Sequence, residues 1–120
     1  MRKAATAVSL SSHVLDAVVG RPAAGVGLTL DRAKNGDWEP IGAGATDDDG
    51  RWRHSDAAAD AELSPGTYRL TFATGDYFRA SGTTGFYPEV IVTFEVTDPA
   101  AHYHVPLLLS PYAYSTYRGS

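Results

Sequence analysis

The chain carries one stretch that decides its fold, His102-Tyr103-His104-Val105-Pro106-Leu107-Leu108-Leu109. Side chains alternate across a β-strand. One face therefore carries the apolar set that belongs in a core, Tyr103, Val105, Leu107 and Leu109. The opposite face mixes polar and apolar groups, His102, His104, Pro106 and Leu108. A wetted outer face is normally polar, whereas strands covered on both faces are nearly continuously apolar, so we expect another subunit to cover this face.

The rest of the chain predicts an all-β protein. Gly and Pro recur about every ten residues, and the segments between them are rich in Val, Leu, Thr, Tyr and Phe, a pattern typical of short strands and turns. We expect about eight strands, which suggests a two-sheet sandwich. Their predicted ranges are 8–18, 25–33, 38–46, 51–54, 67–73, 89–97, 102–110 and 112–118. One interval departs from the pattern: a Thr74 cap, two adjacent aromatics and a Gly82 stop predict one short helix near residues 74–81.

Length and composition set the class of protein. The 120 residues fit a single domain, 1–120, in which we expect residues 1–8 to be a flexible leader. The net charge is −4, with scattered Lys and Arg, which argues against nucleic acid or an anionic membrane as a partner. The chain has no Cys. That excludes thiol catalysis, zinc-thiolate sites and disulfides, and it is compatible with a reducing compartment; we expect a cytoplasmic protein.

Four histidines are candidates for chemistry near neutral pH, His13, His54, His102 and His104. For any single histidine a structural or surface role is more common than a reactive one. Strand alternation favours two of them. If Leu10, Ser12 and Val14 face the core, His13 points outward, where it can meet His104 across a subunit interface.

Other kinds of site have weaker support. His102 and His104 could ligate a cation from one strand, but the nearest carboxylate, Asp98, lies in an Asp-Pro turn, so we expect no metal. A Ser-His-Asp triad can be drawn from Ser115 or Ser120 with His104 and Asp16, yet no Gly-x-Ser-x-Gly elbow supports it. Asp47-Asp48-Asp49-Gly50 lacks the EF-hand spacing and is predicted to be a turn. No Gly-rich phosphate loop leads into a helix, so no nucleotide cofactor is indicated.

The C-terminal stretch from His102 to Ser120, which ends in Tyr117-Arg118-Gly119-Ser120, resembles the signature of 5-hydroxyisourate hydrolases. Three further segments agree in order. They are His13-Val14-Leu15-Asp16 followed by Gly20-Arg21-Pro22-Ala23, then Asp49-Gly50-Arg51, then Tyr87-Pro88-Glu89-Val90. The resemblance therefore covers the chain from about Leu10 onward. The family also contains transthyretin, a carrier that lacks the terminal tetrapeptide found here.

The resemblance implies a transthyretin-like two-sheet β-sandwich with one short helix. It further implies a homotetramer, a dimer of dimers, whose sites lie in a central channel and need no cofactor. The implied reaction, in urate degradation, opens the lactam amide of 5-hydroxyisourate to give 2-oxo-4-hydroxy-4-carboxy-5-ureidoimidazoline. The implied site consists of the catalytic residues His13, Arg51 and His104 and the substrate-binding residues Tyr117, Arg118, Gly119 and Ser120. The family pattern does not include His102.

These residue types suit the implied chemistry. A neutral histidine can take a proton from attacking water near pH 7; we assign that role to His104, with His13 orienting the water, although the two roles can be exchanged. The planar, permanently charged guanidinium of Arg51 suits a carbonyl-rich ring and its developing oxyanion. Tyr117 and Ser120 offer hydroxyl groups that can donate hydrogen bonds to the substrate. Arg118 can instead hold the C-terminal segment in place.

Two non-catalytic functions stay open, because a fold alone does not fix function. One is a transthyretin-like carrier of a small aromatic ligand in the tetramer channel, and the other is a purely structural sandwich. The two histidines beside Arg51 favour catalysis, since an apolar ligand channel needs no proton acceptor. Strict alternation also places Tyr117 with Gly119 on one face and Arg118 with Ser120 on the other, so the tail must bend or divide its contacts.

Overall fold

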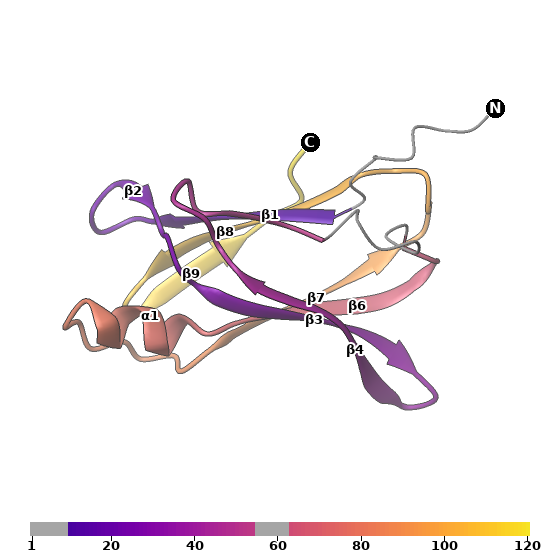
Figure 1. Cartoon of the computed structure of the whole chain (residues 1–120), viewed down its shortest axis with the longest axis horizontal. Coiled ribbons are helices and arrows are strands. Elements are labelled where there is room, and N and C mark those ends of the chain that lie inside the picture. The colour runs from indigo at the N-terminus through magenta and orange to yellow at the C-terminus, as the bar shows by residue number, and fades with distance from the viewer. Residues whose placement is uncertain (1–9, 55–62) are drawn as a thin grey trace.

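The computed structural model describes residues 10–54 and 63–120, which form nine strands and one helix in two layers (Figure 1). The predicted leader, 1–8, lies outside the described residues. The elements in chain order are β1 (Leu10–Asp16), β2 (Arg21–Pro22), β3 (Gly27–Lys34), β4 (Asp37–Ala45), β5 (Arg51–Arg53), β6 (Gly66–Phe72), α1 (Thr74–Ala80), β7 (Val90–Val96), β8 (Tyr103–Ser110) and β9 (Ala113–Thr116).

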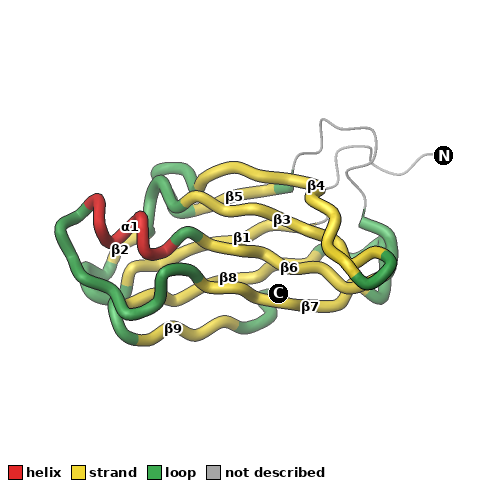
Figure 2. Tube along the Cα trace, turned by 90° about the horizontal axis from the view of Figure 1, so that it is seen from below, coloured by secondary structure: helices red, strands yellow, loops and turns green. Residues whose placement is uncertain are grey.

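The first sheet has the order β2-β1-β8-β9, and β5 also pairs with β1. β1 runs parallel to β8, from Leu10 opposite Tyr103 to Asp16 opposite Leu109. Along its other edge, β1 pairs first with β5 and then with β2. The second sheet is antiparallel, with the order β4-β3-β6-β7. Figure 2 looks onto the face of the sandwich, where the strands of the two layers overlap in the view and α1 lies at one end.

The core lies between the layers and follows the predicted alternation. On β8 the predicted core residues Tyr103, Val105, Leu107 and Leu109 are buried, and on β1 the buried residues include Leu10, Ser12 and Val14. The second sheet contributes large buried side chains such as Leu30, Tyr68, Leu70 and Phe72. The prediction of a two-sheet sandwich is confirmed, and His13 and His104 lie on the face of their sheet that points away from the core.

One strand was missed at the N-terminal end. Arg21-Pro22 lies outside the predicted strand ranges, but it forms β2, opposite Leu15 and Asp16, so the described residues form nine strands rather than eight. The first strand also ends at Asp16 instead of residue 18, and predicted residues 8 and 9 lie outside the described range. Asp16 accepts hydrogen bonds from the backbone N–H groups of Val18 and Val19 at 2.9 and 3.3 Å, which turns the chain.

The last strand is shorter than the predicted 112–118, and Pro106 explains why. The β8–β9 register pairs Leu107 with Thr116, so the next pair outward would join Pro106 to Tyr117. Proline has no N–H to donate to a ladder. The Thr116 hydroxyl instead donates to the Pro106 carbonyl at 2.6 Å. Regular pairing stops there and resumes only as a single bridge between His104 and Gly119.

The predicted helix is present, but its predicted cap is wrong. α1 spans Thr74–Ala80, and Ala73 rather than Thr74 is the N-cap residue. The Thr74 hydroxyl donates instead to the Tyr87 carbonyl at 3.5 Å. The Tyr77 hydroxyl donates to an Asp16 carboxylate oxygen at 2.7 Å, which ties the helix to the end of β1. Burial and this bond raise the pKa of Tyr77 to about 12.

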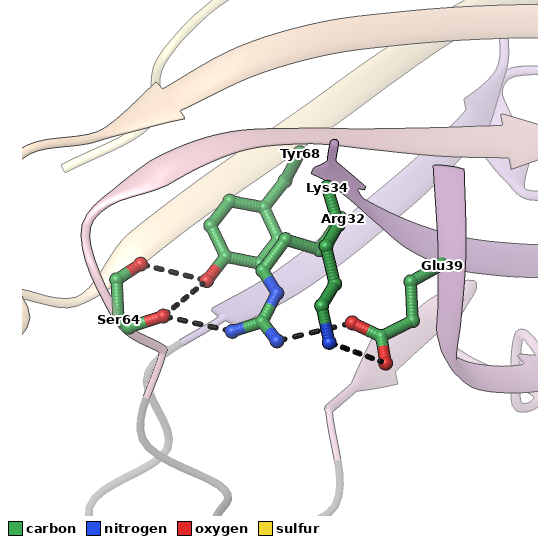
Figure 3. A network of polar contacts seen from close by, with 5 residues as sticks. All are labelled: Arg32, Lys34, Glu39, Ser64 and Tyr68. Atoms are coloured by element: carbon green, nitrogen blue, oxygen red, sulfur yellow. Dashed lines mark hydrogen bonds and ion pairs between the residues drawn. The ribbon is translucent and has the colours of Figure 1, made fainter. Parts of the chain in front are cut away.

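A polar network braces the second sheet (Figure 3). The Arg32 guanidinium donates to Ser64 at 2.9 Å and to Glu39 at 3.0 Å, and Glu39 also pairs with Lys34 at 3.8 Å. The Tyr68 hydroxyl donates to the Ser64 carbonyl at 2.6 Å. This network ties Ser64, which precedes β6, to side chains of β3, β4 and β6. It belongs to the sheet that does not carry His13 and His104.

Candidate functional site

Two rows of side chains cross the outer face of the first sheet. The first row joins Arg51 of β5, His13 of β1 and Pro106 of β8. The second row joins Arg53, Ser11, His104 and, through the single bridge, Gly119. Neighbouring strands lie about 4.8 Å apart. The sheet therefore brings together residues that are far apart in the sequence, including His13, Arg51 and His104.

A hydrogen bond fixes the protonation of one nitrogen of His13. His13 Nε2 lies 2.9 Å from the Asp49 carbonyl oxygen. A carbonyl only accepts hydrogen bonds, so Nε2 carries a proton and donates it. In the neutral ring Nδ1 is then the acceptor nitrogen. His13 is thus oriented by the backbone of a neighbouring turn.

That turn is the acidic run predicted from the sequence, and Asp47 holds it. One carboxylate oxygen of Asp47 accepts from the backbone N–H groups of Asp49 at 2.9 Å and Arg51 at 3.0 Å. The bond from Arg51, followed by the one from Asp49, lowers the pKa of Asp47. Gly50 has φ +75°, and a Cβ there would lie 2.5 Å from the Val14 carbonyl oxygen, so the turn needs glycine. One carboxylate therefore positions both the carbonyl that holds His13 and the start of the strand that carries Arg51.

His104 is half-buried, and its Nδ1 lies 2.8 Å from Ser11 Oγ. Burial is the main cause that lowers its pKa, followed by the positive charge of Arg51 and by the neighbouring His102 and His13. The backbone of Ser11 acts in the opposite direction and raises the pKa. A histidine with a lowered pKa is neutral at pH 7 and can accept a proton.

The site contains residues that sequence reasoning missed. His102 was left out, yet its Nε2 lies 3.0 Å from the same Ser11 Oγ, and its ring is nearly parallel to that of His104, with 6.5 Å between the ring centroids. Ser11 and Arg53 were not singled out. Strand alternation could have identified both, because residues two positions apart share a face: Ser11 precedes His13 by two residues, and Arg53 follows Arg51 by two.

The terminal tetrapeptide divides its contacts. The Gly119 N–H donates to the His104 carbonyl at 2.9 Å. Arg118 places its guanidinium carbon 4.5 Å from the ring centroid of Tyr103, which faces the core, on the side of β8 opposite to His104. Tyr117 and Ser120 are exposed. The structure thus brings Gly119 to His104 and turns Arg118 toward the space between the sheets.

Two hollows border these residues. A polar one of about 290 Å³ is lined by Ser11, Ser12, Asp47, Arg51, Trp52 and Arg53. A mostly apolar one of about 210 Å³ has walls that include Val92, Phe94, Tyr103, Val105, Tyr117 and Arg118. Within residues 10–54 and 63–120, no group of three or more His, Asp or Glu side chains is placed to hold a metal ion. No helix of the same residues is long and apolar enough to cross a membrane.

Fold and site together define a class of protein: a β-sandwich with a parallel β1–β8 pair whose outer face carries a histidine and arginine cluster. The chain belongs to the HIUase/Transthyretin family, whose model matches residues 10–119. It is 45% identical over 124 residues to a 5-hydroxyisourate hydrolase of Salmonella typhi, a match that covers 100% of this chain and 87% of the relative.

Solved structures agree. A 5-hydroxyisourate hydrolase of Klebsiella pneumoniae superposes with a TM-score of 0.80 at 36% identity, covering 92% of this chain and 98% of that one. A sea bream transthyretin in complex with thyroxine superposes with a TM-score of 0.83 at 33% identity, covering 92% and 94%. The transthyretin-like fold predicted from the resemblance is confirmed. Because both proteins share it, the fold does not by itself separate hydrolase from carrier.

Proposed function

We propose that this protein hydrolyses 5-hydroxyisourate in urate degradation and forms 2-oxo-4-hydroxy-4-carboxy-5-ureidoimidazoline. The observation that carries the proposal is the convergence of His13, Arg51 and His104 on one face of the sheet, where burial keeps His104 neutral at pH 7. The full-length match to a hydrolase of that name supports it. The chain is thus a hydrolase, and the expectation that the reaction needs no cofactor stays a prediction.

In the proposed mechanism His104 accepts a proton from water as the water oxygen attacks the lactam carbonyl carbon. The carbonyl oxygen becomes an oxyanion, which the Arg51 guanidinium stabilises. The C–N bond then breaks, and the proton held by His104 passes to the departing ring nitrogen. His13 orients the water through the nitrogen that does not bond to Asp49.

The tail residues complete the proposed site. Gly119 holds the backbone of His104, and Tyr117 and Ser120 offer hydroxyl groups to the substrate. Arg118 is proposed to brace the tail, since its guanidinium lies over the Tyr103 ring. Roles of Tyr117, Arg118 and Ser120 in substrate binding stay predictions.

A carrier function has less support from the site. A channel for an aromatic ligand needs apolar walls, whereas the hollow beside Arg51 has one aromatic wall, Trp52, and is otherwise lined by serines, an aspartate and two arginines. Ionisable groups held on a common face with a perturbed pKa are more typical of catalysis.

We further propose that the protein works as a homotetramer, a dimer of dimers, with the site facing a central channel. Leu108 lies on the same face as His104, and large apolar side chains elsewhere are exposed, among them Val18, Val19, Phe86 and Tyr112. Exposed apolar groups of this size often mark subunit contacts. Sedimentation at micromolar concentration tests the assembly, and a monomer there contradicts it. The cytoplasmic location stays a prediction.

The decisive experiment mixes the purified protein with freshly prepared 5-hydroxyisourate and follows its ultraviolet absorbance. Spontaneous decay is measured in a matched solution without protein. We expect decay to accelerate in proportion to protein concentration and the acceleration to disappear with His104→Ala. Decay at the spontaneous rate with the wild-type protein would reject the proposed activity, and thyroxine binding measured on the same sample would then favour the carrier.

A further inference from the structure

We propose that Ser11 and His102 are positioning residues that hold the proton of neutral His104 on Nδ1, so that Nε2 presents its lone pair to the attacking water. This inference rests on the proposed function and deepens it. Neither residue was part of the site that the family resemblance implied.

The geometry centres on one hydroxyl group. Ser11 Oγ lies 2.8 Å from His104 Nδ1 and 3.0 Å from His102 Nε2. A serine hydroxyl has one proton to donate and two lone pairs that accept. It can therefore donate to only one of the two rings. If His104 Nδ1 receives that proton, the neutral ring of His104 carries its own proton on Nε2 and has no free base there.

Two arrangements satisfy these distances through a continuous donor chain. In the first, His102 Nε2 donates to Ser11 and Ser11 donates to His104 Nδ1; neutral His104 then carries its proton on Nε2 and cannot accept one there. In the second, His104 Nδ1 donates to Ser11 and Ser11 donates to His102 Nε2. Of these two, only the second leaves His104 Nε2 as an acceptor. A Ser11 hydroxyl that accepts from both rings would also leave it free, but its own proton would then need a third partner.

The second arrangement also suits the catalytic step. When Nε2 accepts a proton, the ring becomes an imidazolium, and its Nδ1–H bond to Ser11 becomes charge-assisted and stronger. The acceptor behind a functional histidine is often a carboxylate or a carbonyl. Here it is a neutral hydroxyl. The charged or ionisable groups that act on His104 are Arg51 from β5, His13 from β1 and His102, which directly precedes β8. A carboxylate at position 11 would raise the pKa of His104. A neutral hydroxyl orients the ring and raises that pKa less.

The neighbouring serine provides the matched control. Ser12 also forms a strong hydrogen bond, from its hydroxyl to the Val105 carbonyl at 2.7 Å, but it is buried on the opposite face of β1. Loss of the Ser12 hydroxyl removes a structural bond of β1 without touching either ring. Ser12→Ala therefore separates loss of stability from loss of His104 orientation.

The first test is heteronuclear NMR of the imidazole nitrogens at a pH where His104 is neutral, with its signals assigned by comparison with His104→Ala. We expect Nδ1 of His104 to be protonated in the wild type. Ser11→Ala should destroy this preference, whereas Ser12→Ala should preserve it. A wild-type His104 protonated on Nε2 would overturn the inference. The measurement needs no substrate, so its result stands apart from the success or failure of the proposed activity.

The second test is kinetic. Ser11→Ala should lower kcat about tenfold or more with little change in KM, because the ring loses its orientation; Ser11→Thr, which keeps the hydroxyl, should restore most of the rate. His102→Leu removes the acceptor and should lower kcat less than Ser11→Ala, while His102→Gln, whose amide oxygen can accept, should recover the loss. If Ser11→Ala behaves like Ser12→Ala in both kcat and pH profile, Ser11 has only a structural role and the inference is wrong.

Discussion

Gly119 packs against the ring of His104 so closely that a Cβ atom on Gly119 would lie 2.5 Å from Cδ2 of the imidazole. Carbon atoms do not approach this closely, so any larger residue must displace either the ring or the tail. The Gly119 N–H also donates to the His104 carbonyl at 2.9 Å. The terminal segment and the proposed base are therefore one packed unit.

Gly119→Ala should consequently lower kcat about tenfold or more, since small displacements of a catalytic group are costly. The thermal midpoint should change little, because Gly119 lies at the partly exposed end of the chain. Gly27→Ala is the matched control: the nearest atom to its added Cβ is Ala73 Cβ, at an ordinary 3.8 Å. A Gly119→Ala enzyme as active as the Gly27→Ala enzyme would show that the ring tolerates displacement.

The pH dependence of activity should reflect His104. Its folded-state pKa is lowered from 6.5, so the neutral, proton-accepting form persists below pH 6.5 and is lost as the pH falls through the lowered pKa. We expect the acid limb of kcat/KM to have its midpoint below pH 6.5. Arg51→Met should move that midpoint upward, but only partly, because burial is a larger cause than the Arg51 charge. An acid limb centred above pH 6.5 in the wild type would contradict the assignment.

Asp47 should influence catalysis although it is not assigned a contact with the substrate. Its carboxylate accepts hydrogen bonds from the backbone N–H groups of Asp49 and Arg51, and the Asp49 carbonyl accepts a hydrogen bond from His13. Asp47→Ala should lower kcat several-fold through loss of this geometry, on the principle that positioning contributes to rate, and Asp47→Asn, which keeps an accepting oxygen, should be milder. The neighbouring Asp48→Ala provides the control. Similar kinetics for Asp47→Ala and Asp48→Ala would limit the turn to a passive role.

His54 should make stability depend on pH. Burial lowers its folded-state pKa below 6.5, so around and below that pH the unfolded chain binds more protons than the folded one. The free energy of unfolding should therefore fall as the pH drops through about 6.5, by at most about 1.4 kcal/mol per pH unit for one group. His104 contributes with the same sign. Denaturant unfolding of His54→Gln between about pH 5.5 and 7.5 should show a shallower pH dependence; an unchanged slope would exclude His54 as a source.

Alternation along β1 and β8 made most of the fold predictable. The apolar residues at every second position of β8 fixed which face is core, and the same rule placed His13 and His104 on the outer face. It could not predict the end of β9, because that end depends on Pro106 lying opposite Tyr117, and register is a property of strand pairing. β2 was missed for the same reason, because Arg21 and Pro22 form a strand only through their pairing with Asp16 and Leu15 at the end of β1.

The site was less predictable than the fold. Sequence order gave no sign that the Ser11 hydroxyl contacts both His102 and His104. The contact arises from the parallel pairing of β1 with β8. The turn at Asp47 was predicted, yet its link to His13 was not, because the acceptor is the backbone carbonyl of Asp49, which no residue type reveals. Arg118 was expected on a different face from Gly119. In the structure Arg118 lies over the ring of Tyr103, whereas Gly119 contacts His104.

Arg51 allows a sharp test of electrostatic catalysis because Arg53 provides a matched control on the same strand and the same face. Arg51→Met should lower kcat roughly a hundredfold or more, the usual scale for loss of an oxyanion-stabilising donor. Arg51→Lys keeps the charge but loses the planar two-pronged donor, so it should recover only part of the rate. Arg53→Lys should change kcat less, since Arg53 lies in the row of Ser11 and His104 and is assigned no contact with the oxyanion. Equal losses from Arg51→Lys and Arg53→Lys would mean that the positive field of the whole strand, and not the fork at position 51, stabilises the oxyanion.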